Sequence, residues 1–232
     1  MARRPVFYCL DHSPYYGEEM VTFDYNPGFA DIQKQKNIHN IHRAFTFSHP
    51  EAKILEISSK SETSLGTRLS AFNLKVLTGG LETSLESAFQ AGKVFRDGGP
   101  YYDLLTQPPW IAKKDPRLHN SGPIRYFMLD GVQFPTEPGT FFYDWLYVNA
   151  VNQNKELAVA LTEYDAFTDV EFNPEKSLNC QARSAAIFVS LMKSGLLEKA
   201  LRNPDDFRKT VYGSGSCEKD AGEDTPEQLS FF

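Results

Sequence analysis

A run of apolar residues at helical spacing between Thr83 and Phe95 constrains the fold of this chain more than any other segment. The residues that share the apolar face are Leu85, Ala88, Phe89, Gly92 and Phe95. Thr83 or Ser84 supplies a helix cap, and small side chains on this face let another backbone approach closely. The sequence therefore predicts a central helix over residues 83–95.

A polar stripe flanks this face. Glu86, Gln90 and Lys93 follow one another at i, i+4 and i+7, so a helix would align them on one side. A carboxylate, an amide and an amine in one line could hold and protonate a sugar or a base. The alternative is a solvated helix edge, stabilised weakly by the Glu–Lys pair.

Short strands and several helices are expected around this segment. Residues 5–10 and 20–25 are rich in Val, Phe, Tyr and Thr, which is typical of strands. Residues 29–47 and 173–194 show helical patterns, and Asp130-Gly131 separates two alternating runs, a strong hairpin signal. The predicted fold is a single, mostly helical α+β domain with a small β-sheet.

Three parts of the chain differ in character. We expect an N-terminal extension over residues 1–53 packed on the domain, a main domain over 54–212, and a disordered acidic tail over 213–232. The tail holds five acidic residues and one lysine, so it carries −4 of the net charge of −6. The remaining body is close to neutral, which argues weakly against broad affinity for nucleic acid but leaves room for a local basic groove.

Composition excludes several classes of protein. The chain of 232 residues has no apolar run long enough to cross a bilayer and no recognisable secretion signal. Its three widely spaced cysteines suggest reduced thiols, so we expect a cytoplasmic protein. His39 and His42 form at most half of a metal site, and the sequence indicates neither a metal nor another cofactor.

Three segments resemble the NADAR family, whose members cleave N-glycosidic bonds in ADP-ribose adducts and related ribosylamines. They are LSAFNL at 69–74, LESAFQAGKVF at 85–95 and the segment that begins with YDAFTDVEFNP, contains NCQA and spans 164–192. Together with ILEISSKS, KKDPRL and FYDWLY, they are similar to the branch that acts as antitoxin to a DarT-type DNA ADP-ribosyltransferase toxin.

This resemblance implies a DNA ADP-ribosylglycohydrolase that removes ADP-ribose from guanine bases in DNA and so reverses the toxin. Breaking the C1′–N bond develops positive charge on the ribose, which a carboxylate can stabilise, while the leaving nitrogen needs a proton. The candidate carboxylates are Glu86, Asp165 and Asp169, with their individual tasks left open. Lys93 could act as a cation that binds phosphate or tunes these acids, or as a nucleophile that forms an imine with an opened ribose.

Further residues are expected to bind the substrate. Gln90 and Asn179 could hydrogen-bond the sugar, and Tyr101, beside a glycine turn, could stack on a base. Trp145 could form a wall of the pocket or pack in the core. The family turn adds the candidates Ser70, Phe72 and Asn73.

Two other functions stay open at this point. The chain could be a non-catalytic antitoxin that binds the toxin, although binding alone does not require Glu86 and Lys93 together. It could also be an N-glycosidase acting on a small ribosylamine of the riboflavin pathway. The expected partners are ADP-ribosylated DNA, ADP-ribose as product, and the cognate toxin, with no membrane.

The end of the chain resembles a short linear motif. The residues are Gln228, Leu229, Ser230, Phe231 and Phe232. They are similar to the Gln-Leu-(Ser/Asp)-Leu-Phe pattern by which bacterial polymerases and repair proteins dock on the DNA sliding clamp, with Phe231 in place of Leu. Such a motif on a linker would raise the effective concentration of the protein near DNA.

Overall fold

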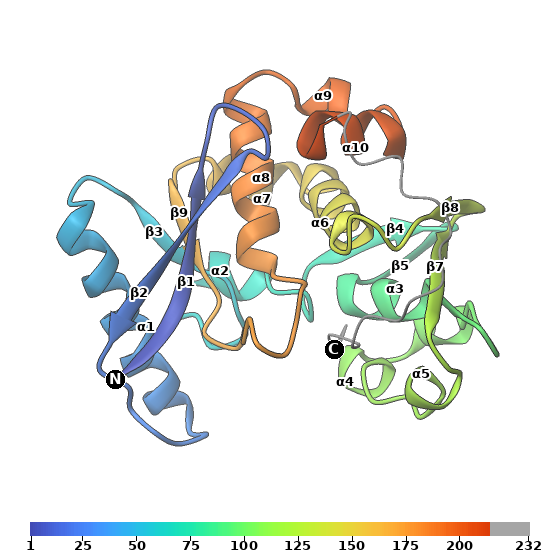
Figure 1. The fold of residues 1–232 in the computed structure, drawn as a ribbon, viewed down its shortest axis with the longest axis horizontal. Helices are drawn as coiled ribbons and strands as arrows, with labels where there is room; N and C mark the ends of the chain where they lie inside the picture. The colour runs from blue at the N-terminus through green and yellow to red at the C-terminus, as the bar shows by residue number, and fades with distance from the viewer. Residues whose placement is uncertain (214–232) are drawn as a thin grey trace, which may run out of the picture.

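The computed structural model describes residues 1–213, and these form an α+β fold, as the sequence predicts (Figure 1). Their strands make a four-stranded sheet, a three-stranded sheet and a two-stranded hairpin. No helix within residues 1–213 combines the length and the apolar character needed to cross a membrane. The predicted tail beyond Gly213, with the motif from Gln228 to Phe232, lies outside the described residues.

The four-stranded sheet brings distant segments together in the order β2-β1-β9-β3. Its strands are β1 (Ala2–Cys9), β2 (Tyr16–Phe23), β9 (Ala166–Thr168) and β3 (Ile54–Glu56). β1 is antiparallel to β2 and β9, whereas β3 and β9 are parallel. Because parallel strands end at the same edge of a sheet, the loops after β3 and β9 lie side by side.

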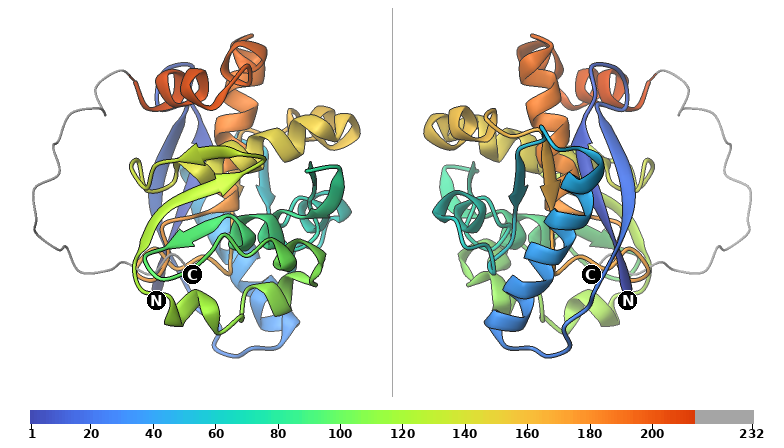
Figure 2. Two further views of the ribbon diagram at one scale, coloured as in Figure 1. Left: turned by 90° about the vertical axis from the view of Figure 1, so that its right-hand side faces the viewer. Right: turned by 90° about the vertical axis from the view of Figure 1, so that its left-hand side faces the viewer.

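A helix covers each face of this sheet. Val6 of β1 packs with Ile38, Ile41 and Phe45 of α1 (Asp31–Ser48), which lies in front of the strands in the right-hand view of Figure 2. The next residue, Phe7, belongs to the main core with α8 (Gln181–Lys193). Successive side chains of a strand point to opposite faces, so the sheet divides two apolar clusters.

The other elements surround the main core. The longer helices are α6 (Phe141–Gln153), α7 (Lys155–Leu161) and α10 (Pro204–Tyr212). The short helices are α2 (Ser64–Arg68), η1 (Tyr102–Thr106), α4 (Pro109–Ala112), α5 (Arg117–Asn120) and α9 (Leu197–Ala200). The hairpin consists of β4 (Lys75–Thr78) and β5 (Leu81–Ser84).

The predicted helix over residues 83–95 is too long at both ends. Helix α3 spans only Leu85–Ala91, and the chain then enters β6 (Lys93–Phe95). The helix ends at Gly92, whose carbonyl accepts a hydrogen bond from Met128 N. The close approach requires glycine there, because a Cβ atom would lie 2.9 Å from the Phe142 ring. Pairing of β6 with β7 (Ile124–Leu129) therefore overrides the helical spacing of the sequence.

The predicted helix over residues 173–194 also begins later than expected. Residues 173–180 form a loop, and α8 starts at Gln181 after an extended Cys180. Arg183 Nη1 donates to Leu178 O, while Arg183 Nη2 contacts the buried Asp144 carboxylate at 3.2 Å. These contacts fix the loop at the start of α8, so Asn179 lies at a loop end and not within a helix.

The predicted hairpin around Asp130-Gly131 is confirmed. β7 and β8 (Val132–Phe134) are antiparallel, and both turn residues have positive φ angles of 50° and 77°. Such angles characterise the type I′ turn that the Asp-Gly pair favours. The proposed domain boundary at residues 53/54 stays a prediction, and strand pairing crosses it, since β1 pairs with β9.

Candidate functional site

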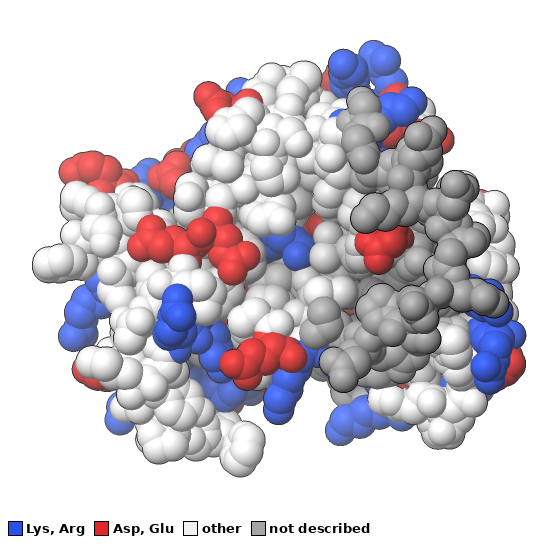
Figure 3. Space-filling view, viewed as in Figure 1, with Lys and Arg blue, Asp and Glu red and all other residues white. Residues whose placement is uncertain are grey.

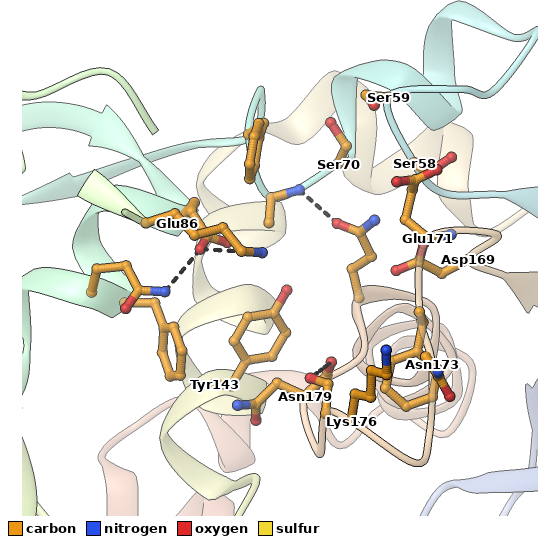
Figure 4. A pocket seen from close by; sticks show the side chains of 18 residues that line it. Ser58, Ser59, Ser70, Glu86, Tyr143, Asp169, Glu171, Asn173, Lys176 and Asn179 are labelled. Atoms are coloured by element: carbon orange, nitrogen blue, oxygen red, sulfur yellow. Dashed lines mark hydrogen bonds and ion pairs between the residues drawn. The ribbon is translucent and has the colours of Figure 1, made fainter. Parts of the chain in front are cut away.

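A polar pocket of about 390 Å³ opens between α3, the turn at residues 70–72, the loop after β3 and the loop before α8. Figure 4 shows Glu86 on one side of this pocket and Asp169 on the other, with Tyr143 between them. Four further residues predicted to bind substrate also line it, namely Ser70, Phe72, Gln90 and Asn179. The fold thus gathers six of the predicted site residues at one cavity.

Glu86 lies in the first turn of α3, which the Ser84 hydroxyl caps by accepting a hydrogen bond from Ser87 N at 3.1 Å. The side chain of Glu86 is buried, with 6% of its surface exposed. Gln90 Nε2 donates to Glu86 Oε1 at 2.8 Å, and Lys113 Nζ lies 3.7 Å from the same oxygen. The predicted i, i+4 pair therefore forms, and an amide and an amine hold the carboxylate at the pocket.

Lys93 lies behind the pocket wall. Its side chain is fully buried at the start of β6, with Nζ 4.9 Å from the centre of the Phe89 ring. Burial lowers the pKa of the Lys93 amine to about 7, although the nearby Glu86 charge opposes this effect. Lys93 is thus close enough to influence Glu86, but it is not among the residues that line the cavity.

Asp169 follows β9 and enters the pocket from the opposite side. Glu171 N donates to Asp169 Oδ1 at 3.0 Å. Burial raises the pKa of the Asp169 carboxyl well above its usual range, and the charge of Glu56 adds to this shift. Glu86 and Asp169 therefore differ in environment, since an amide and an amine hold Glu86, whereas the acids Glu56 and Glu171 lie near Asp169. Groups of this kind are suited to different tasks in acid–base chemistry.

Gln181 joins the two sides of the pocket. Its Oε1 accepts from Ala71 N at 2.7 Å, and its Nε2 donates to Ile57 O at 2.6 Å. The turn that carries Ser70 and Phe72 is thereby tied to the loop after β3. Tyr143 of α6 also lines the cavity, and burial raises the pKa of its phenol well above the usual range. Its hydroxyl consequently stays protonated and can donate a hydrogen bond.

Two amide side chains have unused hydrogen-bonding atoms at the pocket. Both Asn179 side-chain atoms and Gln90 Oε1 are buried without a hydrogen-bond partner among the described residues. A buried polar atom that lacks a partner costs free energy, so such atoms are expected to bind a ligand or water. Asn179 is therefore a strong candidate to contact the substrate.

Four predicted residues lie elsewhere. Asp165 precedes β9 and Asp169 follows it, so roughly 13 Å of extended strand separates them. Asp165 pairs instead with Lys193 at 3.0 Å. Asn73 is exposed, although its Nδ2 donates to Ser70 Oγ at 3.0 Å.

The two predicted aromatic contacts also point away from the pocket. Tyr101 bonds to Ser121 at 2.5 Å and lies under the Arg117 guanidinium. Trp145 packs against Phe134 and Phe207 on the far side of α6, which is the core role that the sequence left open.

Several lining residues were not identified from sequence. They include the polar residues Ser58, Ser59, Lys113, Tyr143, Glu171, Lys176 and Gln181. Lys113 lies in the segment KKDPRL, which is part of the family resemblance, so this segment could have indicated Lys113 as a site residue. The others also fall in segments of the resemblance, but on helices and loops that strand pairing and the late start of α8 bring to the pocket.

The histidine pair has separate partners. His39 Nε2 contacts Glu62 Oε2 at 2.5 Å, and His42 Nε2 contacts Thr168 Oγ1 at 2.8 Å. Residues 1–213 contain no group of three or more His, Cys, Asp or Glu side chains arranged to hold a metal ion.

Comparison with known proteins identifies the family. A family model described as DarT1-associated NADAR antitoxin matches residues 2–221. A search of curated proteins returned no match. Because the family match covers nearly the whole chain, and the pocket gathers the residues that the resemblance singled out, the protein belongs to the NADAR antitoxin family associated with DarT1.

Proposed function

We propose that this antitoxin is an ADP-ribosylglycohydrolase that removes ADP-ribose from guanine bases in DNA. The observation that supports this best is the pair of carboxyl groups on two sides of one polar pocket, Glu86 and Asp169 (Figure 4). Hydrolysis of an N-glycosidic bond needs one group that stabilises positive charge on the ribose and one that protonates the leaving nitrogen. Two acids in unlike environments provide such a pair.

The cations around the pocket suit a diphosphate. Lys113 lines the cavity from the C-terminal end of α4, where it follows the last helical residue, and Lys176 lines it from the loop before α8. ADP-ribose carries two negative phosphates, and lysine is a common phosphate ligand. In the view of Figure 3, basic and acidic side chains are interspersed over the lower half of the molecule. Positive charge on the face shown there therefore forms small groups and not a broad basic surface. We assign the diphosphate to these lysines.

The polar groups that remain suit the sugar and the base. Phe72 lies at the pocket with Lys113 Nζ 5.6 Å from its ring centre, so its ring can stack on a base. Asn179 and Gln90 offer unpaired amide atoms to ribose hydroxyl groups. A ligand with a base, a sugar and phosphates would satisfy all of these groups at once.

The direct test uses a DNA oligonucleotide that carries ADP-ribose on guanine. Incubation with the purified protein is expected to yield free ADP-ribose and unmodified DNA by mass spectrometry. Absence of release at stoichiometric amounts of folded protein would contradict the proposal. Toxin inhibition without release would instead support a binding antitoxin, and release only from a small ribosylamine would support the second enzymatic alternative.

Asn179→Ala is expected to weaken ADP-ribose binding by about tenfold. One hydrogen bond contributes on the order of 1 kcal/mol, and the Asn179 amide has two unpaired atoms. Calorimetric titration with ADP-ribose measures this effect. Asn149→Ala is the matched control, because Asn149 bonds to Trp145 O within its own helix and does not line the pocket. If the two variants bind ADP-ribose with equal affinity, Asn179 does not contact the ligand.

The sliding-clamp motif at Gln228 to Phe232 remains a separate hypothesis. The structural description does not extend to these residues. Titration of a labelled peptide of residues 222–232 with purified clamp tests it, with a Gln228→Ala, Phe232→Ala peptide as the control.

A further inference from the structure

A buried glutamate that the proposed chemistry does not use lies directly beside Asp169. Glu56 ends β3 and exposes 3% of its surface, and its register partner on the parallel strand β9 is Thr168. Thr168 Oγ1 donates to Glu56 Oε2 at 2.6 Å, and Val170 N donates to Glu56 Oε1 at 2.8 Å. Glu56 thus binds the two residues that flank Asp169 and fixes its position.

The hydrogen bonds on the two acids are unequal. Glu56 accepts a third bond from Ser58 Oγ at 2.6 Å, whereas Asp169 accepts two bonds, from Glu171 N and from the Gln181 side chain. Donors stabilise a carboxylate more than a carboxylic acid, so negative charge is favoured on Glu56. Two neighbouring acids do not both ionise easily in a buried site, and the proton of the pair therefore belongs on Asp169.

The other groups around Asp169 do not compensate this charge. Glu171, Tyr143, Tyr147 and Cys180 face it, and each of them would repel a carboxylate if it were ionised. Lys34 pairs with Glu171 at 3.0 Å, and no lysine or arginine within residues 1–213 is among the main causes of the pKa shift of Asp169. Burial lowers the pKa of His42 to about 4, so this histidine is neutral near pH 7 and brings no positive charge to the Thr168–Glu56 chain.

We propose that Glu56 is a positioning residue that carries the negative charge of this pair and keeps the proton on Asp169, so that Asp169 acts as the general acid. The inference rests on the proposed function. As the C1–N bond breaks, its electron pair leaves with the base nitrogen, which takes the Asp169 proton. Water then forms a bond to C1, and its proton returns to Asp169. The repulsion from Glu56 keeps Asp169 protonated before the reaction and favours the return of the proton at the end. Cleavage of the C1–N bond drives the transfer in between, because the leaving nitrogen becomes more basic as it takes the electron pair.

Glu56→Gln removes the charge and can keep the contacts. The amide oxygen can still accept from Ser58 and Val170 N, and the amide nitrogen can donate to Thr168 Oγ1. The Thr168 hydroxyl then donates to His42 Nε2, which requires only the other tautomer of this neutral histidine. The substitution therefore reverses the direction of one hydrogen-bond chain and keeps the three contacts of the Glu56 side chain.

The expected result concerns the pH dependence of turnover. Loss of the Glu56 charge makes Asp169 ionise more easily, so the alkaline limb of the kcat profile should move down by about one pH unit. KM should change little, and turnover below that limb should be retained. A purely structural role would lower turnover equally at all pH values and leave the limb in place, which would overturn the inference.

Controls separate this result from the proposed function. Glu62→Gln, a charge change at an exposed acid paired with His39, should leave the limb unmoved. If Glu56→Gln does not fold, Thr168→Val is the second variant, because it is nearly isosteric and removes one hydrogen-bond donor from Glu56. It should move the alkaline limb of the kcat profile to lower pH by a smaller amount. Titration of the Asp169 carboxyl carbon by NMR needs no turnover, and an unchanged midpoint in Glu56→Gln would refute the inference even if the protein proves inactive.

Discussion

Replacing Glu86 with glutamine is expected to lower the rate of ADP-ribose release from DNA by about two orders of magnitude or more. The carboxylate lies in the pocket wall with 6% of its surface exposed, where water screens charge poorly. Positive charge that develops on the ribose in the transition state would therefore feel its full effect. Glutamine keeps the shape and can still accept from Gln90 Nε2, so the loss should appear in kcat and not in folding.

Single-turnover release followed by mass spectrometry measures this rate, and thermal unfolding confirms the folded state. Asp165→Asn is the matched control, because Asp165 is also a predicted catalytic acid but pairs with Lys193 and does not line the pocket. It should retain most of the activity. Loss of activity in Asp165→Asn with retention in Glu86→Gln would place the chemistry at another site.

Lys93→Met is expected to lower turnover by a similar factor. Methionine suits this test better than alanine, because the lysine side chain is completely buried and truncation would leave a cavity. The sequence left open a solvated helix edge for Lys93, and the complete burial of its side chain contradicts that alternative. A variant with a rate near that of the wild type would exclude both catalytic roles considered for Lys93.

The pH dependence distinguishes those two roles. With a pKa of about 7, half of the amine is neutral at that pH. An imine requires the neutral amine, so turnover would rise with pH through about 7, and borohydride would trap a covalent adduct. A role as a cation beside Glu86 requires the protonated form, so turnover would fall through the same range and no adduct would form.

Stability offers a readout that does not depend on turnover. The folded pKa of about 7 lies below the value of about 10.4 for an unfolded lysine. Between these values the unfolded chain binds the additional proton, so the free energy of unfolding of the wild type rises with pH by up to about 1.4 kcal/mol per unit. Lys93→Met should abolish this increase. If the free energy of unfolding rises equally with pH in the wild type and in Lys93→Met, Lys93 is charged in the folded state.

The sequence by itself determined the family, the α+β class and the contact between Glu86 and Gln90. Glu86 and Gln90 lie four residues apart on a short helix, so local geometry alone brings them together. The turn at Asp130-Gly131 was also predictable, because its backbone angles favour these residue types. These features depend on neighbours in sequence.

The tertiary structure determined which of the candidate site residues lie together at the pocket. Lys93 was predicted on the same helix stripe, but β6 pairs with β7 and carries its amine behind Phe89. Asp165 and Asp169 look equivalent in sequence, yet three residues of β9 send them to opposite ends of a strand. The role proposed for Glu56 had no local signal, since it depends on the parallel register that sets Glu56 beside Thr168, 112 residues away along the chain. Pairing between distant strands is a property of the whole chain, and so no short segment encodes it.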